Sequence, residues 1–147
     1  MRFLQRSWWT APLVSFNWIR ALDLASESKY KAALKRLTLI EKLRGPNLSP
    51  MGGISAEYYL LKGHMLYCFD DDAASSDNFS AGIDELDRSD DYSAEEKKYL
   101  LAYASSCHPR LNLPIAPVGE IETIDLGSVR IGLKMIFPLE THPRWDE

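Results

Sequence analysis

A chain of 147 residues is long enough to bury the core of one domain, and its 46% apolar and 26% charged residues are typical of a globular protein. This composition excludes a disordered or membrane-embedded chain. The net charge of −4 is uneven, because residues 1–50 carry +6, residues 51–100 carry −8 and the remainder −2. The acidic middle third favours a basic protein partner and disfavours nucleic acid, although the basic first third also suits nucleic acid or anionic lipid.

The cysteines and the N-terminal segment bear on where the chain resides. Cys68 and Cys107 are too few for a disulfide framework and are interpreted as reduced thiols of a cytoplasmic protein. The first 25 residues begin with basic and apolar positions, but Asn17 and Arg20 interrupt them and no small-residue cleavage site follows, so we expect no secretory signal. No run reaches the roughly 18 to 20 apolar residues of a membrane span, so no integral membrane association is expected.

Helical spacing dominates residues 12–107. The segment 12–25 repeats apolar residues at Leu13, Phe16, Ile19 and Leu22 or Leu24, and Pro12 suits a first helical turn. A second helix is predicted over 29–43, with Ser28 as its N-cap and an exposed lysine face. Its buried stripe is predicted to be Ala33, Leu34, Leu37, Ile40 and Leu43.

Three further helices are predicted before residue 108. Ser55 is a candidate N-cap for a helix over 56–69, and the acidic triplet 70–72 makes a turn into a helix over 73–87. Ser93 and Glu96 have the spacing of a capping box, which marks the start of the last helix. Beyond it, prolines and alternating apolar residues favour an extended or β-hairpin tail over 108–147.

Residues 56–89 resemble a tetratricopeptide repeat, a pair of antiparallel helices of about 34 residues. Tyr59, Gly63, Leu66 and Phe79 stand at its aromatic, small, bulky and second-helix aromatic positions. In the same register Ala21 and Ala102 are the small residues of neighbouring units, 42 residues before and 39 residues after Gly63. Lys62 and Ser75 depart from the motif, where leucine and alanine are usual.

The resemblance implies a mainly α fold. Antiparallel hairpins of about five helices would stack as a short right-handed solenoid over 12–107, and the 108–147 tail would pack on it within a single domain, 1–147. It also implies a concave groove lined by the first helix of each hairpin. The predicted partner-binding residues there are Trp18, Glu57, Leu60, His64, Tyr67, Glu96, Tyr99 and Tyr103. Asp70, Asp71 and Asp72 are added as acids that steer a basic partner. The alternative is that these aromatic residues pack against the tail and bind nothing.

Gly63 is predicted to be the point of closest helix approach. Gly63→Leu should therefore disrupt packing, whereas His64→Ala should leave the fold intact.

Two other readings of the chemistry remain open. His64, Cys68, Cys107 and His108 are four nitrogen and sulfur ligands, so a metal-binding site or a thiol enzyme is the alternative to a binding module. Their spacing departs from paired C-x2-C motifs, and no orienting third residue is visible. Arg2 and Arg6 beside Trp8 and Trp9 are compatible with membrane-surface association.

The sequence favours a non-catalytic protein-protein interaction module with no cofactor. One concrete hypothesis is an immunity or antitoxin-type protein that masks a basic toxin, because the chain has an acidic middle and no catalytic motif.

Overall fold

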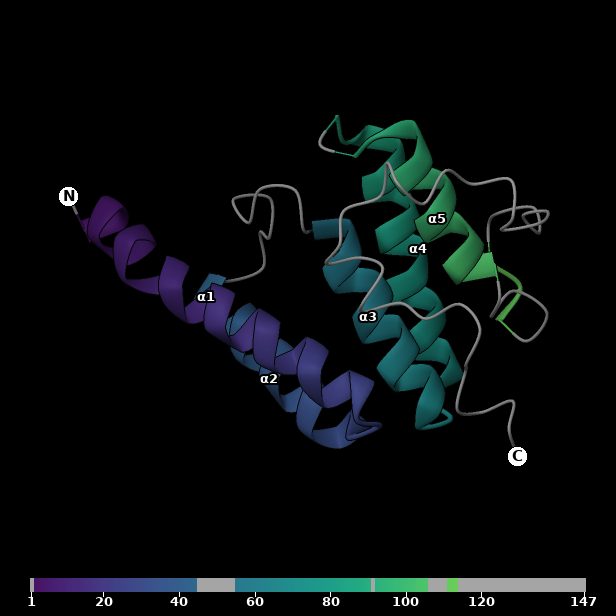
Figure 1. Cartoon of the computed structure of the whole chain (residues 1–147), viewed down its shortest axis with the longest axis horizontal. Helices are drawn as coiled ribbons and strands as arrows, with labels where there is room; N and C mark the ends of the chain where they lie inside the picture. The colour runs from purple at the N-terminus through teal and green to yellow at the C-terminus, as the bar shows by residue number, and fades with distance from the viewer. Residues whose placement is uncertain (1, 45–54, 91, 106–110, 114–147) are drawn as a thin grey trace. The chain divides into compact units, whose positions relative to one another are not determined.

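The computed structural model describes residues 2–44, 55–90, 92–105 and 111–113, and these are mainly α-helical. Five helices occupy the described ranges (Figure 1): α1 Arg2–Ser26, α2 Tyr30–Arg44, α3 Ser55–Cys68, α4 Asp72–Arg88 and α5 Ala94–Ser105. The chain divides into two compact units, residues 1–51 and 52–147. The predicted tail, residues 108–147, lies outside the described residues except for 111–113. The single-domain and solenoid expectations stay predictions.

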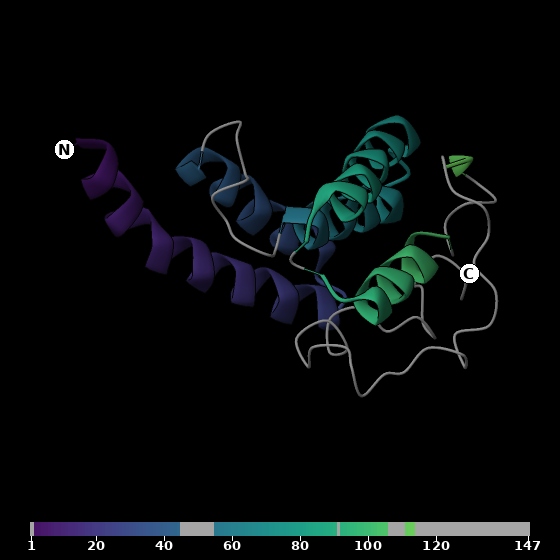
Figure 2. The same ribbon diagram turned by 90° about the horizontal axis from the view of Figure 1, so that it is seen from above.

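In the first unit, α1 and α2 form an antiparallel hairpin, and the N-terminal part of α1 runs past the end of α2 (Figures 1 and 2). The predicted α2 stripe is confirmed for Ala33, Leu37 and Ile40, which are fully buried, whereas Leu34 and Leu43 are half-buried at its edges. A polar link joins the two helices: Arg36 donates to the Asn17 side-chain oxygen at 3.1 Å, and the Asn17 amide donates to the Leu13 carbonyl at 2.8 Å.

The sequence analysis was wrong about α1 in two respects. The helix begins at Arg2, with Pro12 inside it rather than in its first turn. A proline removes one backbone hydrogen bond, which weakens a helix without always ending it. Of the predicted stripe, Leu13, Phe16 and Ile19 are exposed and Leu24 is buried. From residue 12 onward, the buried residues of α1 are Val14, Asn17, Trp18, Ala21 and Leu24. Because α1 is apolar on two sides, spacing alone does not tell which side faces α2.

The turn between α1 and α2 ends the first helix with a left-handed residue. Ser28 has φ 62°, the Lys29 N–H donates to the Leu24 carbonyl at 2.9 Å, and the Ser28 N–H donates to the Ala25 carbonyl at 3.0 Å. This is a Schellman motif, in which the left-handed position usually holds glycine. Ser28 therefore closes α1 and is not the N-cap of α2, because α2 begins only at Tyr30.

Ser28→Gly should raise the free energy of unfolding by about 0.5–1 kcal/mol, because glycine adopts a positive φ without the clash that a Cβ causes. Urea denaturation followed by circular dichroism measures the change. Ser26→Gly is the matched control: it makes the same replacement inside the last turn of α1, where glycine costs roughly 0.5–1 kcal/mol. Equal destabilisation by both variants would contradict the turn assignment.

In the second unit, α3 and α4 form a hairpin held at two close approaches. A Cβ added at Gly63 would lie 2.9 Å from the Phe79 ring, and one added at Gly82 would lie 2.8 Å from the Leu60 side chain. The Ser75 hydroxyl donates to the Gly63 carbonyl at 2.6 Å, a buried hydrogen bond between the helices. The small residue predicted at position 63 is thus confirmed as a close approach of α3 and α4.

Both helices that follow the α3–α4 turn begin with side-chain caps. The Asp71 carboxylate accepts from the Ala74 N–H at 3.3 Å, which caps α4. At α5, the Ser93 N–H donates to the Glu96 carboxylate at 3.0 Å and the Glu96 N–H donates to the Ser93 hydroxyl at 3.1 Å. This reciprocal pair is the predicted capping box, and it fixes where α5 starts.

Candidate functional site

The residues predicted to line an open groove are buried in the structure. Leu60 is fully buried, and the exposed fraction of each of the others is 8% or less. They are Trp18 in α1, Glu57, Leu60, His64 and Tyr67 in α3, and Glu96, Tyr99 and Tyr103 in α5. Leu60 lies against Gly82 of α4, so its role is to pack the hairpin. Contact with a partner at these positions would need them to become exposed.

His64 and Tyr103 form the most specific contact of this buried set. The Tyr103 hydroxyl and the His64 Nδ1 share a hydrogen bond, and the two rings meet edge to face with centroids 5.3 Å apart. The Phe79 ring lies 6.3 Å from that of Tyr103. The contact therefore joins α3, α4 and α5, and a buried hydrogen bond between two polar side chains favours one arrangement of the helices.

The other polar side chains of the predicted groove are also explained locally. Glu96 belongs to the α5 capping box, and Glu57 lies in the first turn of α3, where the helix dipole favours a carboxylate. Burial raises the pKa of Tyr99 to about 12, so its hydroxyl is neutral over the physiological range. The two acids of the predicted groove, Glu57 and Glu96, are thus buried within the helical unit.

The structure describes two of the four candidate metal or thiol residues, His64 and Cys68. His64 uses Nδ1 toward Tyr103, and Cys68 follows one turn later on α3, partly exposed. Cys107 and His108 lie outside the described residues. Over the ranges that the structure covers, no group of three or more His, Cys, Asp and Glu is arranged to hold a metal ion. The metal or thiol hypothesis therefore stays a prediction.

Five exposed acids of the α3–α4 hairpin and the half-buried Asp72 form what we call the acidic surface. It consists of Asp70, Asp71 and Asp72 in and beside the turn, together with Asp77, Asp84 and Asp87 on α4. Asp77 and Asp84 lie opposite the buried Phe79, Ile83 and Leu86, and Asp87 lies beside them. Residues 55–90 and 92–105 hold 11 Asp+Glu against 4 Lys+Arg, so the helices that carry the acidic surface also have a negative net charge.

The sequence analysis included the turn acids and missed those of α4. Asp77 and Asp84 are spaced by seven residues, which places them on one side of the predicted helix. That spacing was the signal available in the sequence.

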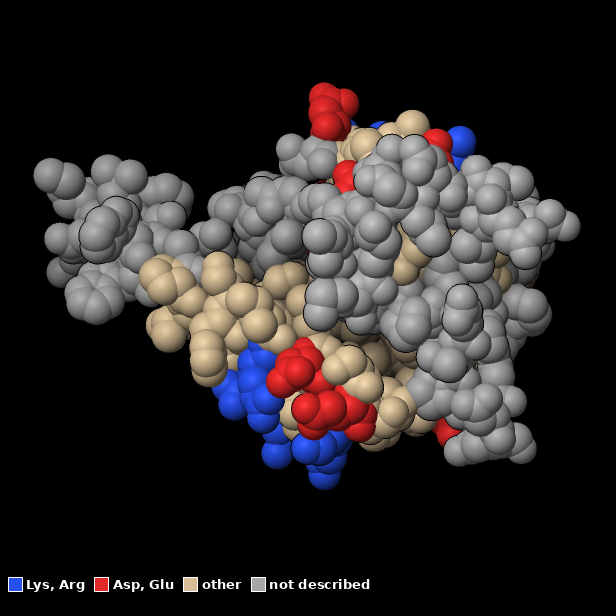
Figure 3. Space-filling model, in the orientation of Figure 1, with Lys and Arg blue, Asp and Glu red and all other residues tan. Residues whose placement is uncertain are grey.

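The first unit exposes both apolar and charged side chains. Apolar side chains are exposed on the middle of α1, and Lys, Arg, Asp and Glu gather beside the α1–α2 turn (Figure 3). Over the described residues of the chain, no helix is long and apolar enough to cross a membrane.

Comparison with family models, with curated proteins and with solved structures finds no match.

Proposed function

We propose that the chain is a non-catalytic protein-binding module whose acidic surface recognises a basic protein. One observation carries the proposal: the acids of the α3–α4 turn and of the outer side of α4 are largely exposed, whereas the aromatic residues predicted to bind a partner are buried. Exposed charges of one sign accelerate encounter with a partner of the opposite sign and disfavour other partners.

We extend the proposal to the architecture, a tetratricopeptide-like right-handed solenoid of helical hairpins. It is supported by the buried small residues at the positions that the motif assigns, Ala21 and Ala102, and by the close approach of Gly63 to Phe79. A module of this kind presents surfaces of stacked helices and needs no cofactor. Its cytoplasmic location rests on the cysteine usage alone.

An immunity or antitoxin-type protein is the concrete version of this function. Such a protein binds one basic toxin and masks it, a task that needs complementary charge and no reacting groups. The support is physical, namely the excess of acids over bases in the helical unit that carries the acidic surface.

The test compares two triple variants in binding to the protein encoded by the neighbouring gene and to partners captured from the producing cell. Asp77→Asn, Asp84→Asn and Asp87→Asn neutralise the α4 part of the acidic surface, while Asp23→Asn, Glu27→Gln and Glu41→Gln remove the same charge from the first unit. At low salt we expect a roughly tenfold lower association rate for the first variant and little change for the second.

Association should also slow between low and high salt, because exposed charges are screened. A captured basic partner whose association rate is the same for the wild type and the α4 variant would contradict recognition through the acidic surface.

A further inference from the structure

The middle of α1 has an exposed apolar side between residues 13 and 19. Leu13, Phe16 and Ile19 are 49%, 59% and 65% exposed, and their three-residue spacing places them on one side of the helix. We call these three residues the α1 apolar face. Single exposed apolar side chains are ordinary, but three adjoining ones mark a surface that is covered in use.

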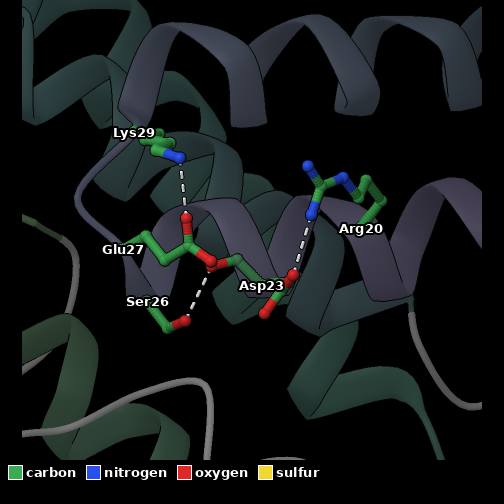
Figure 4. Close-up of polar contacts among 5 residues, drawn as sticks. All are labelled: Arg20, Asp23, Ser26, Glu27 and Lys29. Atoms are coloured by element: carbon green, nitrogen blue, oxygen red, sulfur yellow. Dashed lines mark hydrogen bonds and ion pairs between the residues drawn. The ribbon is translucent and has the colours of Figure 1, made fainter.

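Positive charge accompanies this face. The Arg36 guanidinium lies 5.8 Å from the centre of the Phe16 ring. This cation–π contact places a positive charge at the edge of the α1 apolar face. Residues 2–44 contain 9 Lys+Arg and 3 Asp+Glu. The acids at the end of α1 are ion-paired, Asp23 with Arg20 at 2.8 Å and Glu27 with Lys29 at 2.9 Å (Figure 4).

The excess charge argues against two possible occupants. A second copy seated on the same face would bring two units of charge +6 together, which is repulsive. The acidic surface of another copy would attract the charge, but over residues 56–90 and 92–105 the large apolar residue that is exposed is Phe69. The carboxylates would then lose hydration against the α1 apolar face without gaining a hydrogen bond or an ion pair there, which costs free energy.

We propose that the α1 apolar face docks on an anionic lipid surface. Such a surface supplies negative headgroups for the basic hairpin and a hydrocarbon boundary for Leu13, Phe16 and Ile19. The helix would lie in the plane of the interface, with its apolar side chains entering to a depth of about 5–10 Å. This site lies on the first unit and does not depend on recognition of a basic protein by the acidic surface.

The test is co-sedimentation of the full chain with vesicles of phosphatidylcholine alone and of phosphatidylcholine mixed with phosphatidylglycerol. The wild type should bind the mixed vesicles about tenfold more tightly than the neutral ones. Phe16→Ser with Ile19→Ser should weaken this binding by about tenfold or more, because two large apolar groups no longer enter the interface. Phe69→Ser, which replaces an equally exposed aromatic residue of the second unit, should bind like the wild type.

Three results would overturn the proposal. Absence of binding to both vesicle types excludes a lipid surface, and undiminished binding by the Phe16→Ser, Ile19→Ser variant excludes the apolar face. Sedimentation velocity without lipid supplies the third: a wild-type dimer that this variant converts to a monomer would assign the α1 apolar face to a second copy. Circular dichroism confirms that the exposed substitutions leave the helices intact.

Discussion

Gly63→Leu should lower the free energy of unfolding by about 1–3 kcal/mol or more, because the new side chain would occupy the place of the Phe79 ring. A Cβ alone would lie 2.9–3.2 Å from three ring atoms of Phe79, which is fully buried and has no space to retreat. Urea denaturation monitored by circular dichroism measures the loss.

For Gly63→Ala, the sign of the change in the free energy of unfolding tests whether the close approach exists. In an open helix position alanine is more stable than glycine by about 1 kcal/mol, so a stabilised Gly63→Ala variant would show that the close approach is absent. We expect the opposite, a loss. Replacing Phe79 with leucine in the Gly63→Ala background should recover part of it, since the ring atoms that meet the new Cβ are then gone. A double-mutant cycle over these two positions isolates the contact.

Tyr103→Ala should lower the free energy of unfolding by about 3–5 kcal/mol, the usual cost of truncating a buried aromatic residue. Tyr103 is 2% exposed and contacts both His64 of α3 and Phe79 of α4. Helix α5 contacts the α3–α4 hairpin far less extensively than α3 contacts α4, so the loss of one large side chain should loosen its attachment. Faster amide hydrogen exchange along α5 than along α3 in this variant would show the loosening directly.

Tyr103→Phe separates the ring from the hydroxyl. It keeps the aromatic packing and removes the hydrogen bond to His64, for an expected loss of about 1–3 kcal/mol. If Tyr103→Phe were as damaging as Tyr103→Ala, the ring would contribute little and the packing argument for α5 would be wrong.

The local signals in the sequence predicted most of the helical boundaries. The capping box at Ser93 and Glu96 and the acidic turn before α4 act over three or four residues, so local spacing is enough to find them. The small residue at Gly63 was found by a pattern that spans two helices, and its close approach to Phe79 is confirmed.

The errors arose where the outcome depends on tertiary packing. Helix α1 offers two apolar sides, and α2 covers the side that contains Ala21 and Trp18. Ser28 has the residue type of an N-cap, but its positive φ ends one helix instead of starting the next. Neither result follows from the spacing of apolar residues or from cap preferences alone.

The candidate site illustrates the same limit. The aromatic and acidic residues of α3 and α5 have the composition of a binding surface, but burial in this unit is decided by how the three helices meet. His64, expected from the sequence to tolerate truncation, is 7% exposed and hydrogen-bonded to Tyr103, so we now expect His64→Ala to cost about 1–3 kcal/mol.

The two helical hairpins have turns of the same geometry, each closed by a left-handed residue. At the end of α3, Asp70 has φ 61°, the Asp71 N–H donates to the Leu66 carbonyl at 3.1 Å, and the Asp70 N–H donates to the Tyr67 carbonyl at 3.1 Å. This is the hydrogen-bond pattern found around Ser28 at the end of α1. Ser28 and Asp70 are separated by 42 residues, as are Ala21 and Gly63.

The same interval relates residues across the second helices, where Ala33 and Ser75 are both fully buried, as are Leu37 and Phe79. The two hairpins therefore keep one interval of 42 residues through both helices and the turn, and they bury residues at equivalent positions. The chain thus builds the same turn geometry twice, once in a basic hairpin and once in an acidic one, so this geometry does not depend on the charge of the hairpin surface.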